Sequence, residues 1–114
     1  MDKDKTITWE DFDKVDIRIG TIIEVEPFLG VKKPAYKMLI DFGDLGIKKT
    51  SAQLTKLYQP NDLLGKQILA VINFPKKQIK NIMSECRVLG VTNNLGEVVV
   101  AETERKMPNG MRID

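Results

Sequence analysis

Side chains alternate along an unusually long stretch of this sequence, from Val15 to Val25. The odd positions are mostly apolar, whereas most even positions are polar, charged or glycine. Successive side chains of a strand point to opposite faces, so this period of two predicts one long strand whose odd positions, Ile23 included, face the core. Gly20 lies near the middle and suits the bend or bulge of a strand that belongs to both halves of a small barrel.

The rest of the chain predicts further short strands separated by turns. Proline, glycine and asparagine mark the breaks, for example at Pro34, Gly43 and Gly96. A short helix is expected from Thr8 to near Lys14, because Asp11 follows Thr8 at the spacing of a capping box. The predicted strands run over 36–42, 47–51, 67–72, 87–91 and 98–101, with a helix-like connector over 53–58.

These elements favour an all-β fold: a five-stranded OB-fold (Greek-key) barrel with a short N-terminal helix and small connecting helices. An SH3-like barrel is the alternative, and the long bent first strand and the connector favour the OB-fold over it. A chain of 114 residues with no repeat, low-complexity tract or linker fits one domain over residues 1–114.

Composition excludes several classes of function. The chain has no histidine and one cysteine, Cys86, so it lacks the commonest metal ligand, the commonest general base and a disulfide framework. Cys86 is expected to be a packed thiol. The carboxylates are scattered, and neither a glycine-rich phosphate loop nor a nucleophile beside a base is present. We therefore expect a binding protein and not an enzyme, with no cofactor and no metal.

The apolar runs also indicate in which cellular compartment the protein is expected. None is long enough to span a bilayer, and the first residues, MDKDKTITW, alternate in charge instead of forming the apolar stretch of a secretory signal. We expect a cytoplasmic protein without membrane insertion.

Cations and apolar side chains interleave over residues 73–89, NFPKKQIKNIMSECRVL. Four cations stand among large apolar residues here: Lys76, Lys77, Lys80 and Arg87 beside Phe74, Ile79 and Met83. Such a surface can hold a phosphate backbone with stacked bases, or an extended peptide with acidic or apolar side chains. A net charge of +2 permits either ligand, so the composition leaves the choice open.

Each candidate contact also has a structural alternative. The lysines can be solvated loop residues, Arg18 can pair with Asp16 or Glu24 on its own strand face, and Asn73 can satisfy backbone groups where a strand ends. As ligand contacts, the cations would meet phosphates or carboxylates, and the Asn73 amide would meet a base edge or a peptide backbone. Ser84 is either part of a turn or a hydroxyl near phosphate or ribose.

Four strings, in order, resemble one family: KVDIRIGTI at 14–22, KPAYKMLIDFG at 33–43, TSAQLT at 50–55 and AVINFPKKQI at 70–79, followed by SE at 84–85 and VLGV at 88–91. The chain is similar to the CsaA branch of the tRNA-binding-domain family, a branch of secretion-related chaperones. The resemblance implies an OB-fold barrel, a homodimer built through the terminal extensions, and binding of unfolded, export-bound polypeptide or of tRNA.

The resemblance also assigns residues. At positions that match the tRNA-binding relatives stand Asn73, Pro75, Lys76, Lys77, Lys80 and Ser84. The chain follows the CsaA branch in having Cys86 and Arg87 at the family's Gly and Met positions, and Lys33 with Pro34 where relatives have a His-Pro element. The full set expected to bind peptide or tRNA is Arg18, Ser51, Gln53, Asn73, Phe74, Lys76, Lys77, Ile79, Lys80, Met83, Ser84 and Arg87.

Apolar residues near both ends are expected at a dimer interface formed by the extensions 1–14 and 102–114: Trp9, Phe12, Met107, Pro108 and Met111. The two aromatics could instead cover one end of the barrel. The leading hypothesis is a CsaA-like chaperone in protein secretion, with unfolded polypeptides and the secretion motor as candidate partners. The alternative is a structure-specific tRNA-binding protein that uses the same groove.

Overall fold

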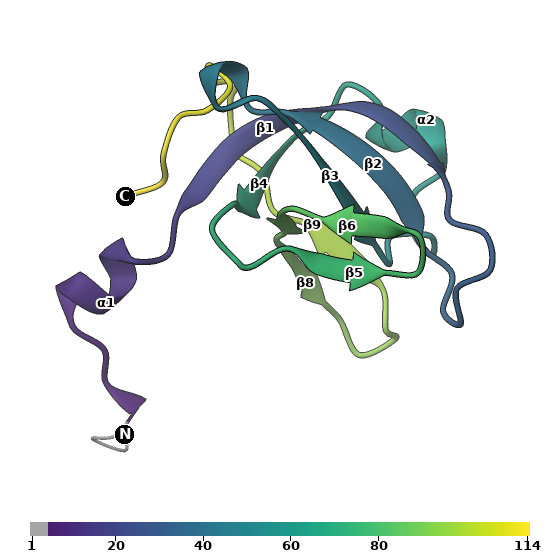
Figure 1. Ribbon diagram of the computed structural model, residues 1–114, viewed down its shortest axis with the longest axis horizontal. Helices are drawn as coiled ribbons and strands as arrows, with labels where there is room; N and C mark the ends of the chain where they lie inside the picture. Colours follow the sequence, from purple (N-terminus) through teal and green to yellow (C-terminus); the bar gives the residue numbers. More distant parts are fainter. Residues whose placement is uncertain (1–4) are drawn as a thin grey trace.

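An antiparallel sheet curls into a nearly closed barrel in the computed structural model, which describes residues 5–114 (Figure 1). Its strands follow the order β3-β2-β1-β4-β7, and two hairpins, β5-β6 and β8-β9, are added to it. The strands are β1 (Ile17–Pro27), β2 (Tyr36–Asp41), β3 (Ile47–Ala52), β4 (Gln67–Val71), β5 (Lys77–Ile79), β6 (Ile82–Ser84), β7 (Arg87–Val88), β8 (Gly90–Thr92) and β9 (Val98–Val100). The helices are α1 (Trp9–Asp13), a 3-10 turn η2 (Gly43–Leu45) and α2 (Pro60–Leu63). The expected OB-like barrel is confirmed.

β1 takes part in both halves of the barrel, pairing with β4 through its first half and with β2 through its second. The predicted phase of its side chains is wrong from Gly20 to Ile23, where the even positions Gly20 and Ile22 face the core, and it holds again at Val25 beyond the bulge. The register shifts between Ile22 and Glu24, which makes Ile23 the extra residue of a bulge and reverses the alternation beyond it. Consequently Ile22 is fully buried, whereas Ile23 is 41% exposed.

Gly20 has another role than the bend expected of it, because the bulge lies further along the strand. A β carbon at Gly20 would lie 2.6 Å from Cγ2 of Ile40 and 2.7 Å from the Phe42 ring. Phe42 and Ile40 are both fully buried, so the missing side chain lets the core close against the β1 backbone.

The connector between β3 and β4 also differs from the prediction. Residues 55–57 form only a turn, and the helix begins at Pro60, which was expected to close one. Proline suits the first position of a helix because its missing N–H would have no partner there. The Gln59 N–H donates to Oδ2 of Asp62 at 2.8 Å and so fixes this start. Leu63 then enters the core.

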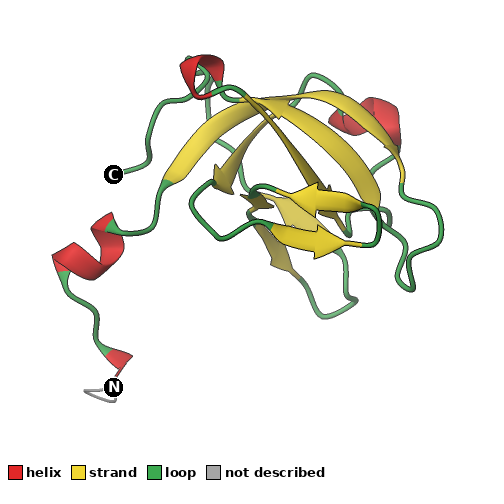
Figure 2. Ribbon diagram, in the orientation of Figure 1, coloured by secondary structure: helices red, strands yellow, loops and turns green. Residues whose placement is uncertain are grey.

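The segment over 87–91 is two strands instead of the single one predicted. It breaks at Leu89, after which β8 leaves the sheet to pair with β9. On the other side, the chain between β6 and β7 closes the barrel, because the Glu85 N–H donates to the Lys49 carbonyl at 2.8 Å. In the view of Figure 2, both hairpins lie below the long curved strands β1 and β2.

The terminal segments lie outside the barrel. The predicted capping box of α1 is present, with the Asp11 N–H bonded to Thr8 Oγ1 at 3.0 Å. This helix buries none of its residues and extends away from the barrel, leaving Trp9 89% exposed (Figure 1). The C-terminal segment instead runs along β1, where the Ile113 N–H donates to the Ile17 carbonyl at 2.9 Å. No helix within residues 5–114 is long and apolar enough to cross a membrane.

Candidate ligand-binding groove

A groove of about 1110 Å³ lies between the β1–β2 loop, the end of β3, the β4–β5 connection and the β8–β9 hairpin. Aliphatic and aromatic side chains form part of its walls, including Phe28, Val31, Phe74, Ile79 and Val98. Phe74 is 54% exposed at the rim, which leaves its ring accessible to a ligand.

The charged side chains of the groove all have one sign. Its lining contains five cations and no carboxylate: Lys32, Lys33, Lys76, Lys77 and Arg87. The whole chain, by contrast, is nearly balanced, with 18 basic and 16 acidic residues. A concave surface lined by one sign of charge focuses its field and attracts ligands of the opposite sign.

Eight of the residues predicted to bind ligand line this groove: Ser51, Gln53, Phe74, Lys76, Lys77, Ile79, Ser84 and Arg87. The β1–β2 loop contributes a wall that the sequence reasoning did not include, with Val31, Lys32 and Lys33. The expected fold could have predicted this wall, because the loop between the first two strands of an OB-fold commonly borders the ligand. Those two lysines belong with the candidate contacts.

The Ser84 hydroxyl lines the groove and lies against the buried hydroxyl of Thr50. Oγ1 of Thr50 and Oγ of Ser84 lie 3.2 Å apart, and both donate to the Cys86 carbonyl, at 2.8 Å and 3.2 Å. Burial raises the pKa of the Cys86 thiol to about 11, so this thiol stays protonated near neutral pH. Ser84 and Cys86 therefore add no charge to the lining of the groove.

Glu85 lies next to the groove and partly neutralises one of its cations. Its Oε1 accepts a hydrogen bond from the Lys49 N–H at 2.9 Å, and its Oε2 lies 3.6 Å from Nζ of Lys76. The Lys49 backbone bond is the main reason why the pKa of Glu85 is lowered, with nearby lysines adding to it. Lys76 itself is 65% exposed and can still reach a ligand.

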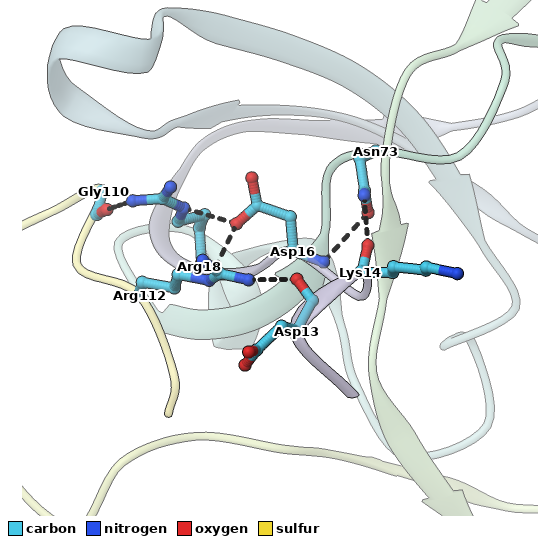
Figure 3. Close-up of polar contacts among 7 residues, drawn as sticks. All are labelled: Asp13, Lys14, Asp16, Arg18, Asn73, Gly110 and Arg112. Carbon is cyan, nitrogen blue, oxygen red and sulfur yellow. Dashed lines mark hydrogen bonds and ion pairs between the residues drawn. The ribbon is translucent and has the colours of Figure 1, made fainter. Parts of the chain in front are cut away.

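Arg18 lies elsewhere, in a cluster that we call the terminal clasp: Asp13, Lys14, Asp16, Arg18, Asn73, Gly110 and Arg112 (Figure 3). Nε of Arg18 lies 2.7 Å from Oδ1 of Asp16, and its Nη1 donates to the Gly110 carbonyl at 3.0 Å. Nε of Arg112 lies 3.6 Å from the same Asp16 oxygen. The structural alternative for Arg18, pairing with Asp16, is therefore the arrangement seen.

Asn73 belongs to the clasp as well. Its Oδ1 accepts a bond from the Asp16 N–H at 3.0 Å, and its Nδ2 donates to the Lys14 carbonyl at 2.6 Å (Figure 3). The amide thus holds the segment between α1 and β1, while the next residue, Phe74, forms a groove wall. In this arrangement both polar atoms of the side chain are engaged within the protein.

The other two candidates border the groove without lining it. Nζ of Lys80 donates to the Gly30 carbonyl at 3.0 Å, at the tip of the β5–β6 hairpin. Met83 is 38% exposed and pairs with Gln78 across the same hairpin. Among residues 5–114, no three Asp, Glu, Cys or His side chains come together in a group that would hold a metal ion.

The chain matches one domain family and solved structures of CsaA chaperones. Residues 17–112 match the family model described as "Putative tRNA binding domain". The crystal structure of the chaperone CsaA from Bacillus anthracis is 45% identical, with a TM-score of 0.91 over 96% of this chain and 99% of that one. The CsaA chaperone protein from Picrophilus torridus is 46% identical, with a TM-score of 0.88 over 96% of this chain and 100% of that one.

Curated sequences that match include large enzymes. The methionine–tRNA ligase of Listeria monocytogenes is 32% identical over 107 residues, which are 91% of this chain and 15% of the ligase. That of Flavobacterium johnsoniae is 32% identical over 111 residues, again 15% of the enzyme. This chain therefore spans about a seventh of the length of these relatives.

Proposed function

Because this chain belongs to the tRNA-binding-domain family, we propose that it is a CsaA-like chaperone that binds unfolded or export-bound polypeptides in the groove. The observation that carries the proposal is a groove that combines apolar walls with five cations and no carboxylate. The similarity to CsaA structures over nearly the whole of both chains supports the same reading. On this proposal the protein acts by binding alone, without catalysis, in the cytoplasm, where the secretion motor is a candidate partner.

Polypeptide binding would use both kinds of surface in the groove. Apolar side chains of an extended client would pack against Phe74 and Ile79, each adding roughly 25 cal/mol for every Å² of apolar surface removed from water. Acidic client side chains would meet the lysines, and the Gln53 amide is available to the client backbone. Such contacts are tolerant of sequence, as a chaperone requires.

We further propose that two copies associate through their terminal extensions. Helix α1 buries nothing in its own chain, and Trp9 is 89% exposed. A second, smaller cleft of about 350 Å³ lies between the C-terminal extension and β1, and its lining includes Ile19, Met107 and Met111. Two grooves on one particle would raise the apparent affinity for a long client through effective concentration.

The dimer proposal has its own test. Trp9→Ala should convert a dimeric particle to a monomer in sedimentation or light scattering, while leaving the far-ultraviolet circular dichroism of the barrel unchanged. Leu29→Ala is a suitable control, because Leu29 is 80% exposed and lies in the β1–β2 loop, away from both termini. A wild-type particle that is already monomeric would refute the dimer.

A second function, structure-specific binding of tRNA, is favoured by the charge of the same groove. Five cations without a lining carboxylate suit a phosphate backbone as well as acidic peptide. A tRNA mode would read shape and phosphates with few base contacts, and its affinity would fall steeply with salt. A polypeptide mode would tolerate salt and depend more on Phe74, Ile79 and Met83.

A competition titration separates the two functions. Labelled bulk tRNA is bound at physiological salt and challenged with a reduced, carboxymethylated protein that cannot fold. Polypeptide binding with weak, salt-sensitive tRNA binding supports the chaperone. Tight tRNA binding that the polypeptide fails to displace supports the tRNA-binding alternative, and undiminished tRNA affinity after Lys76, Lys77 and Lys80 are all changed to Ala would refute the groove as its site.

A further inference from the structure

The turn between β5 and β6 holds Lys80 in an unusual backbone conformation. Its φ of 50° is the only positive value at a non-glycine residue within the described part of the chain. A two-residue turn that needs a left-handed first residue normally has glycine there, because a β carbon crowds the neighbouring carbonyl. The Gln78 side chain supports the conformation, since its Nε2 donates to the Lys80 carbonyl at 2.6 Å.

The lysine side chain crosses from this hairpin to the β1–β2 loop. Its Nζ donates to the Gly30 carbonyl at 3.0 Å. A β carbon at Gly30 would lie 1.9 Å from that Nζ and 3.0 Å from Cε of the lysine. The lysine can therefore lie across residue 30 only because residue 30 is glycine.

This hydrogen bond joins two of the elements that contribute residues to the lining of the groove, the β1–β2 loop and the β5–β6 hairpin. Gly30 directly precedes Val31, which lines the groove, and Lys80 directly follows Ile79, which lines it as well. The β5–β6 turn reaches toward the β1–β2 loop in Figure 1 as well. Backbone strain that persists beside a binding surface points to a role there.

We infer that Lys80 is a positioning residue: it latches the β1–β2 loop to the β5–β6 hairpin and fixes the width of the groove, without contacting the ligand itself. The inference rests on the proposed function, because it concerns the groove to which we assign ligand binding. The ammonium donates to a carbonyl of its own chain, whereas that of Lys77, which lines the groove, makes no hydrogen bond or ion pair within residues 5–114.

Lys80→Met tests the latch, since it keeps most of the aliphatic stem and removes the donor. Lys77→Met is the matched control, with the same loss of charge on the same hairpin. In the free protein, amide hydrogen exchange at Phe28, whose N–H donates to the Ala35 carbonyl at 2.9 Å and closes the β1–β2 loop, should become at least about threefold faster in Lys80→Met and stay unchanged in Lys77→Met. Unchanged exchange in Lys80→Met would overturn the latch, whatever the ligand.

Salt dependence of binding to bulk tRNA then separates positioning from contact. Lys80→Met should weaken binding about threefold without changing the slope of log Kd against log salt, whereas Lys77→Met should reduce that slope by about 0.7 to 0.9. A slope lowered equally by Lys80→Met would show a phosphate contact and overturn the inference. If wild-type protein binds neither tRNA nor the carboxymethylated protein, the proposed function fails, and the exchange experiment alone decides on the latch.

A second pair of variants tests the latch from the β1–β2 loop. Gly30→Ala and Gly65→Ala both place alanine at a positive φ, of +81° and +85°, but a β carbon at Gly65 meets nothing within 4 Å. Both variants should lose similar thermal stability from backbone strain. Only Gly30→Ala should accelerate exchange at the Phe28 amide, which closes the β1–β2 loop. Equal exchange in the two variants would contradict the latch.

Discussion

The terminal clasp and the groove are both rich in cations, and they use them differently. In the clasp, Arg18 and Arg112 converge on Asp16 and also donate to backbone carbonyls, those of Gly110 and Asp13 (Figure 3). In the groove, the one ion pair among the described residues is Lys76 with Glu85, at 3.6 Å. A cation satisfied within its own chain holds the fold, whereas a cation left to solvent in a concave surface is available to a ligand.

The largest expected effect comes from breaking the clasp. Asp16→Asn removes the charge that two arginines share and should lower the free energy of unfolding by about 2 kcal/mol, since hydrogen bonds to charged groups contribute roughly that much. Urea denaturation measures it. Affinity for ligand should change less than about twofold, because no clasp arginine lines the groove.

Asp44→Asn is the control for that experiment, because Asp44 is an exposed carboxylate in η2. Its stability should stay within about 0.5 kcal/mol of wild type. If Asp16→Asn unfolds like wild type, or loses ligand affinity as groove variants do, the clasp does not have the structural role assigned to it.

The reverse pattern is expected in the groove. Lys76→Ala combined with Lys77→Ala should change stability by less than about 0.5 kcal/mol, because both side chains are solvent-exposed. The affinity of this double variant for bulk tRNA should fall roughly tenfold, and the slope of its log Kd against log salt should be smaller than that of wild type. Lys56→Ala combined with Lys66→Ala removes the same charge outside the groove and should retain affinity; equal losses in the two pairs would mean that only net charge matters.

A smaller effect of opposite sign is expected from Glu85→Gln. Freeing Lys76 from its carboxylate should raise tRNA affinity about twofold, the size of a surface ion pair. Weaker binding in this variant would show that Glu85 serves the groove by orienting Lys76.

The same variant has a pH signature. Hydrogen bonding from the Lys49 N–H lowers the pKa of Glu85 below its ordinary 4.5, so the carboxylate stabilises the folded protein above pH 4.5 and loses that contribution as pH falls through its lowered pKa. The stability of wild type relative to Glu85→Gln should therefore shrink on acidification to about pH 3. Urea denaturation at neutral and acidic pH measures it, and a constant difference would contradict the assigned bond.

Local patterns in the sequence predicted the barrel well because its strands alternate and its turns carry glycine, proline or asparagine. The bulge at Ile23 was missed, because Ile22 and Ile23 are both apolar and only pairing with β2 decides which is buried. The start of α2 was missed because Pro60 was taken as the end of a helix, although proline also suits a first turn.

The candidate site was predictable where residues lie close in sequence, as in the stretch from Phe74 to Ile79. Arg18 shows where prediction from local sequence patterns fails. Strand alternation placed its side chain outside the core, but one of its partners, Gly110, lies 92 residues away and no local pattern specifies that contact. The hydrogen bond from Lys80 to Gly30 joins residues 50 positions apart, and no local sequence pattern predicts it either.

The most direct test is a map of where ligand binds. Amide chemical shifts of isotope-labelled protein are followed by nuclear magnetic resonance during titration with the carboxymethylated protein, and separately with tRNA. Our account predicts shifts concentrated over residues 31–35, 51–54, 74–79 and 84–88, with Arg18 and Arg112 unmoved. Shifts centred on the terminal clasp, with the groove unchanged, would contradict it.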